Sequence, residues 1–110
     1  MIEPKETIYS ILNTIDDVTV YQNTPKVLKD LPCIVFFIEG NTPEYDLGKE
    51  IAYQDITVVI DIFGRNSKES GSLLSTLVSI MINSDYRMVF CSDIPDENTS
   101  HITTRFNLVG

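Results

Sequence analysis

The sequence predicts an α+β domain: a mixed, mainly antiparallel β-sheet of about five strands with two helices packed on one face. The first observation is a long period-two segment, residues 53–63, in which one parity, counted from the preceding Ala52, is almost wholly aliphatic (Ala52, Gln54, Ile56, Val58, Ile60 and Ile62). The second is a stripe at three- and four-residue spacing, formed by Leu73, Leu74, Leu77, Val78, Met81 and Ile82. The element order, helix, three strands, helix, two strands, favours helices on one face of a sheet.

The N-terminal third predicts one helix and two strands. The helix begins at Glu3-Pro4, where a proline and an acidic residue suit the first turn, and its stripe runs through Ile8, Ile11, Leu12 and Ile15. A short strand at 18–21 and a loop at 22–31 follow. Residues 33–39 are apolar on both parities, so we expect this strand to be covered on two faces or to lie in an interface.

The central segment is expected to begin with a long connection at residues 40–50, which is rich in Asn, Pro, Gly and charged residues. After the strand at 53–63, Asn66 or Ser67 can cap the second helix, with Glu69 placed as in a capping box. We expect the helix stripe to lie on the strand face formed by Ile56, Val58, Ile60 and Ile62.

The C-terminal part predicts two strands joined by an acidic turn. In residues 86–91, alternation places Met88 and Phe90 on one face. Residues 92–100 form the turn. The last strand alternates clearly, with Ile102, Thr104, Phe106 and Leu108 opposed to His101, Thr103, Arg105 and Asn107.

The composition indicates one domain of 110 residues without a membrane span or a signal peptide. The formal charge of −8 and the scattered basic residues disfavour direct nucleic-acid binding. Cys33 and Cys91 lie in apolar, strand-like segments, so we expect two buried thiols. Neither has a second Cys or His at ligand spacing, and no metal site is expected.

The residues offer little support for catalysis, so we expect no enzyme, cofactor or metal. His101 is the single histidine, expected to be solvated on the polar parity of its strand. Asp55 and Asp61 are six residues apart on one strand, about 20 Å by strand rise, too far to share a proton or metal. The glycines before the second helix do not form a phosphate loop. The cluster Asp93, Asp96, Glu97 and Asn98 lacks calcium-site spacing.

The order of parts resembles a known family. After the first helix come Val20-Tyr21, a loop with Pro25, and Leu31-Pro32-Cys33-Ile34-Val35. Tyr53 and Val58-Val59-Ile60-Asp61-Ile62-Phe63-Gly64 lead into the helix at 73–81, then Tyr86-Arg87-Met88, an acidic turn, and His101-Ile102-Thr103-Thr104-Arg105-Phe106. This pattern resembles the tail-terminator, or tail-completion, proteins of long-tailed bacteriophages and phage-tail-like particles.

The resemblance implies a structural virion protein that forms a homo-hexameric ring at the head-proximal end of the tail tube. Such a ring stops tube growth and docks the head connector or neck protein, and DNA only passes through its channel. The implied location is the tail or neck of the virion, and the host cytoplasm during assembly. Contacts are expected from the chain ends and from two loops, with these candidate residues: Asn41, Glu44, Tyr45, Asp46, Lys49, Asp93, Asp96 and Glu97.

Because the ring would multiply the acidic charge, its contacts must come from apolar area or backbone pairing. Residues 33–38 and the edge strands are the expected candidates. Two alternatives stay open. One is another neck or head-completion protein, and the other is a small-ligand regulatory module of the ferredoxin-like kind.

Overall fold

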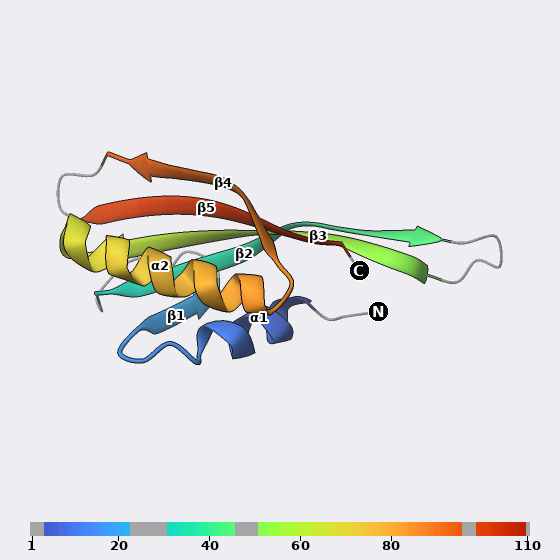
Figure 1. Cartoon of the computed structure of the whole chain (residues 1–110), viewed down its shortest axis with the longest axis horizontal. Coiled ribbons are helices and arrows are strands. Elements are labelled where there is room, and N and C mark those ends of the chain that lie inside the picture. The colour runs from blue at the N-terminus through green and yellow to red at the C-terminus, as the bar shows by residue number, and fades with distance from the viewer. Residues whose placement is uncertain (1–3, 23–30, 46–50, 96–98, 110) are drawn as a thin grey trace.

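A computed structural model describes residues 4–22, 31–45, 51–95 and 99–109, with the backbone alone at 41–45, 51–54 and 109. Two helices and five strands follow one another in the predicted order (Figure 1). Their bounds are α1 (Pro4–Leu12), β1 (Thr19–Gln22), β2 (Cys33–Tyr45), β3 (Ile51–Gly64), α2 (Ser67–Asn83), β4 (Arg87–Ile94) and β5 (Ser100–Val109).

The strands form one mixed sheet in the order β1-β2-β3-β5-β4. β1 pairs with β2 in parallel, and the other three pairs are antiparallel. The central strand is β3, which pairs with β2 along one edge and with β5 along the other. The predicted fold class is therefore confirmed, including the central position of the long alternating strand.

The main core lies between the sheet and the two helices. Ile56, Val58, Ile60 and Ile62 of β3 are fully buried in one cluster with residues of both helices, as the period-two pattern predicts. From α2 the buried residues are Ser70, Leu73, Leu77 and Met81. Ile82, which the sequence assigned to the same stripe, is instead 56% exposed on the outside of the helix. Ile82 lies at the margin of the stripe, one helical step beyond the buried Met81, and therefore faces away from the sheet.

A second, smaller apolar cluster lies on the other face of the sheet, which no helix of the described chain covers. Cys33, Val35 and Phe63 are buried there, with Tyr21 and Leu31 packed against them. Residues 33–36 are thus buried on both faces, as their sequence predicts. The expectation that 33–38 forms a ring contact fails for this part, because β1 and β3 already pair with its two edges.

The predicted connection at residues 40–50 is wrong over much of its length. β2 continues to Tyr45 and β3 starts at Ile51. The two strands pair in one register from Gly40–Thr57 to Glu44–Tyr53, and the register shifts before Tyr45–Ile51. Figure 1 shows these ends as a two-stranded arm that extends beyond the helices and the other strands. Gly, Asn and Pro are depleted in strands, so their presence at the start of this segment predicted a loop instead of a strand. Pro43 is tolerated because β2 has no outer partner strand in the described chain at that point.

β4 also differs from the prediction. The strand runs to Ile94, so residues 92–94 belong to it and not to the acidic turn. Its register with β5 shifts between Met88 and Phe90, which places Met88 opposite Phe106 and Phe90 opposite Arg105. The two residues therefore lie on opposite faces, against the expectation from simple alternation, since a bulge inserts one extra residue. Cys91 is exposed and was predicted to be buried.

Candidate assembly surface

The outermost strand of the sheet, β4, is exposed along nearly its whole length. It stands at the end of the strand order, so its outer edge has no strand partner within the described chain. Met88, Val89, Phe90 and Ile94 are 38%, 53%, 45% and 39% exposed, and Cys91 is exposed between them. Long, apolar, unpaired edge strands readily pair with other chains. This strand is the clearest candidate for a contact between molecules.

On the helix-free face, a row of side chains crosses four strands from this edge. Register places Phe90, Arg105, Val59 and Phe37 side by side on β4, β5, β3 and β2. The Arg105 guanidinium carbon lies 5.3 Å from the centre of the Phe90 ring, and Arg105 Nε donates to Glu39 Oε2 at 2.8 Å. Phe37 is 38% exposed at the other end of the row. The ion pair is half-exposed and thus contributes little stability, but it holds Arg105 over Phe90.

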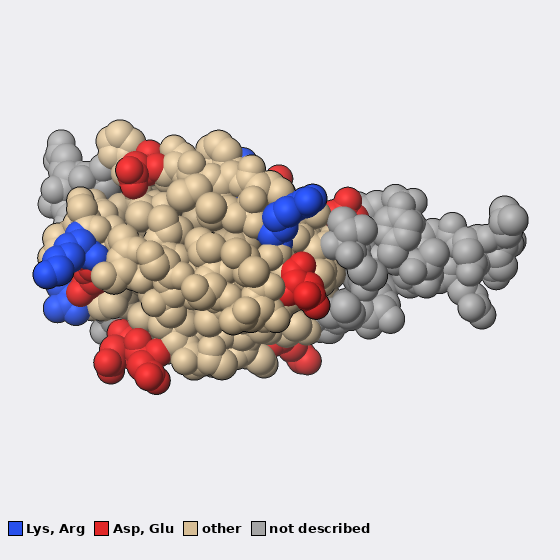
Figure 2. Space-filling model, in the orientation of Figure 1, with Lys and Arg blue, Asp and Glu red and all other residues tan. Residues whose placement is uncertain are grey.

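Beyond its first turn, the outer face of α2 carries no charge. Between Glu69 and Asn83 the helix has no charged residue, and its exposed positions are Ser72, Ser75, Thr76, Ser79 and Ile82. Figure 2 shows the consequence on the helix side of the molecule, where charged side chains gather toward the ends and uncharged residues cover the centre. The outer side of a surface helix normally carries charged or polar residues, and here it carries only uncharged polar residues and the exposed Ile82. The uncharged face of α2 is therefore a second candidate contact.

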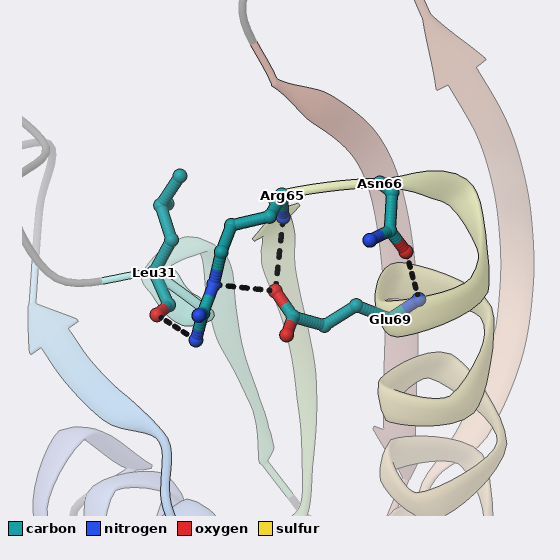
Figure 3. A network of polar contacts seen from close by, with 4 residues as sticks. All are labelled: Leu31, Arg65, Asn66 and Glu69. Atoms are coloured by element: carbon teal, nitrogen blue, oxygen red, sulfur yellow. Dashed lines mark hydrogen bonds and ion pairs between the residues drawn. The ribbon is translucent and has the colours of Figure 1, made fainter.

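A polar network fixes the turn between β3 and α2 (Figure 3). The Asn66 side chain caps the helix, because its Oδ1 accepts from Glu69 N at 2.9 Å. Glu69 Oε1 in turn accepts from Arg65 N at 2.9 Å and lies 3.3 Å from Arg65 Nε. Arg65 Nη2 donates to the carbonyl oxygen of Leu31 at 2.8 Å. The predicted Asn66 cap is confirmed, and the network joins the start of α2 to Leu31, two residues before β2.

His101 is not the solvated strand residue that the sequence suggested. Its side chain is 14% exposed and its ring stacks on Phe63, with centroids 4.1 Å apart. Nε2 lies 3.7 Å from Asp61 Oδ2, beyond hydrogen-bond distance. Asp55 has a separate partner, since its Oδ1 accepts from Asn107 Nδ2 at 2.6 Å. The two aspartates thus do not act together, as their spacing predicted.

An open groove of about 850 Å³ lies between the first turns of α2 and the ends of β4 and β5. Its polar lining includes Arg65, Asn66, Ser92 and His101. Ser70 and Ser100 also line it, but their hydroxyl oxygens lie 2.6 Å apart and bond to each other. Within the described residues, no group of three or more His, Cys, Asp and Glu side chains could hold a metal ion.

The structure places only some of the predicted contact residues. Asn41, Glu44 and Tyr45 belong to the β2 strand of the arm. Asp93 is exposed on β4, opposite Ile102. Asp46, Lys49, Asp96 and Glu97 lie outside the described residues. The sequence reasoning missed Met88, Val89 and Phe90 as surface residues. Their signal was the run Met-Val-Phe-Cys, apolar on both parities, which an interior strand would show equally.

No protein-family model matches the chain, and no curated protein sequence matches it. Neither helix, within the residues that the structure describes, has the length and apolar character to cross a membrane.

Proposed function

We propose that this protein is a structural assembly protein of the tail-terminator kind. It would form a ring on the head-proximal end of a phage tail tube, stop tube growth and dock the head connector. The proposal starts from the resemblance of the sequence to that family. The observation that supports it best is the exposed, apolar edge of β4, because an unpaired edge of this type readily pairs with another chain.

Two further features agree with a role in assembly. A partner could cover the uncharged outer face of α2 without removing charged side chains from water. Charged residues are likewise depleted at the centres of protein interfaces. The arm is a two-stranded ribbon where β3 extends beyond its pairing with β5. Two-stranded ribbons are marginally stable alone, so a neighbouring molecule would stabilise this one.

The net charge suits a channel protein that does not hold DNA. Sixteen acidic and eight basic residues give each copy a formal charge of −8. A ring of such subunits repels phosphates, whereas a basic lining would bind them in a salt-dependent way. DNA would then slide through without specific contacts.

Of the two alternatives, the element order counts against only the regulatory module. A neck or head-completion protein would differ in its partner more than in its surfaces. The regulatory module was suggested by ferredoxin-like proteins, whose order is β-α-β-β-α-β, and the order here is α-β-β-β-α-β-β. We therefore retain assembly as the leading proposal.

The test uses purified tail tubes, with and without the protein. Light scattering and electron microscopy should show capped tube ends that no longer elongate. Val89→Lys places a charge on the β4 edge and should abolish capping. Asn13→Lys introduces the same charge at an exposed residue just after α1 and should leave capping intact. A protein that leaves tubes uncapped and changes its mass only with a small ligand would favour the regulatory alternative.

A further inference from the structure

β4 presents apolar side chains on both faces of the sheet. Register with β5 puts Met88 and Cys91 on the helix side, opposite Phe106 and Thr104. Phe90 and Ile94 lie on the helix-free side, opposite Arg105 and His101. A strand that added to this edge would bury most area if it too were apolar on both faces. A second β4 meets that requirement.

We propose that two copies of the free protein pair through antiparallel β4 strands, about a two-fold axis at Phe90. This goes beyond the proposed function, because it concerns the protein before it meets a tail tube. The pairing would join two five-stranded sheets into one, with the helices of both copies on the same side. Two-fold contacts are the commonest among homo-oligomers, and each copy contributes the same patch.

The bulge in β4 restricts the register. Residues directly opposite each other in a sheet lie on the same face. In β4 the alternation of side chains between the two faces is interrupted at Val89, the extra residue between Met88 and Phe90. With Phe90 opposite Phe90 of the second copy, and with Val89 skipped in both, Met88 faces Cys91. Arg87 then faces Ser92. Within residues 88–91, this register pairs apolar residues with apolar residues on each face.

Charge also favours a second copy in antiparallel orientation. Arg87 begins β4 and Asp93 lies near its end, with no charged residue between them. Antiparallel pairing sets the Arg87 end of each copy beside the Asp93 end of the other, with the two side chains on opposite faces of the sheet. Parallel pairing would bring like charges together. The net charge of −8 per copy opposes association, so we expect the dimer to depend on protein concentration.

A two-fold contact also closes on itself. Both copies use the same edge, so the pair leaves no free β4 and growth stops at two. Bulges often protect exposed edges from pairing, but here Val89 itself is 53% exposed and adds apolar area. The dimer would thus cover an edge that otherwise invites aggregation. A ring that uses β4 would have to replace this contact.

The test is a disulfide whose formation depends on the register. Met88→Cys places a thiol opposite Cys91 of the second copy, and directly opposed residues are about 4.5 to 5.5 Å apart at Cα, within disulfide reach. Mild oxidation should give a covalent dimer on a non-reducing gel. The unmodified protein should form little, because Cys91 faces Met88. Met88→Cys combined with Cys91→Ser should form none.

Sedimentation of the unmodified protein gives an independent measurement. It should show a monomer–dimer equilibrium that Val89→Lys shifts to monomer and Asn13→Lys leaves unchanged. A strict monomer at every concentration, or equal cross-linking after Cys91→Ser, would overturn the proposal. Capped tubes together with a monomeric free protein would sustain the proposed function and reject the dimer. A dimer that leaves tubes uncapped would do the reverse.

Discussion

His101 and Asp61 form a diagonal cross-strand pair on the helix-free face, with Nε2 3.7 Å from Oδ2 and the imidazole stacked on Phe63. His101 Nε2 and Asp61 Oδ1 are buried and find no hydrogen-bond partner in the described part of the chain. The pair is therefore held by packing of the imidazole on Phe63 and not by a hydrogen bond. Its contribution should therefore be to stability and not to a reaction.

His101→Ala should lower the free energy of unfolding by about 1–2 kcal/mol, because it removes the ring stack and opens a gap beside Phe63. His101→Phe, which retains a ring, should recover most of that loss. Denaturant unfolding of the two variants provides the measurement. Loss of tube capping in His101→Ala with unchanged stability would contradict this and assign a direct functional role to the histidine.

Tyr86→Phe should stabilise the protein by about 1 kcal/mol at neutral pH. The Tyr86 hydroxyl is buried without a hydrogen-bond partner among the described residues, and an unsatisfied buried group costs free energy. Thermal unfolding of the variant would show this as a higher midpoint. A lower midpoint would imply a partner for the hydroxyl outside the described chain.

The same residue predicts an alkaline effect. Burial raises the pKa of the Tyr86 phenol above its ordinary value of 10.0. Above that pH the unfolded chain releases the proton while the folded chain retains it, so the free energy of unfolding falls until the folded phenol also ionises. Tyr86→Phe should lose this part of the pH dependence. Equal slopes above pH 10 in both proteins would contradict the prediction.

Leu77→Ala should cost about 2–5 kcal/mol, as for a large-to-small change in a core. Leu77 is fully buried in the cluster that α2 forms with β3. Ser75→Ala, an exposed position on the same helix, is the control and should change little. Denaturant unfolding measures both, and a loss below about 0.5 kcal/mol for Leu77→Ala would be incompatible with this packing.

Gly64→Ala should destabilise the protein by about 1–3 kcal/mol. A Cβ at Gly64 would lie 3.0 Å from the backbone nitrogen of Ser70 and 3.1 Å from its Cβ, so the first turn of α2 would have to move. Gly71→Ala is the matched control, since nothing lies within 4 Å of its added Cβ. In a helix interior that change should stabilise by about 1 kcal/mol. Thermal unfolding would reveal opposite shifts.

Ring assembly should strengthen as salt concentration rises. The acidic subunits repel each other, and salt screens that repulsion over a Debye length of about 8 Å at physiological ionic strength. Sedimentation of ring-forming samples across a salt series would test this. Rings that dissociate as salt rises would show that attractive ion pairs, not apolar contacts, hold the subunits together.

The sequence by itself determined the fold class, the element order and the helix-side core. Ile56, Val58, Ile60 and Ile62 could be assigned to one face because side-chain period is a local property of the chain. The Asn66 cap could be predicted for the same reason, since its partner Glu69 lies three residues away.

Only the tertiary structure decided which apolar strand is interior and which is edge. Residues 33–36 and 88–91 are both apolar on two parities, yet the first are buried and the second exposed. The difference arises from strand order, with β2 between two neighbours and β4 at the end. Strand order depends on pairing between residues far apart in the sequence, such as Met88 with Phe106, and local periodicity carries no information about it. The candidate assembly surface therefore became visible only in the folded chain.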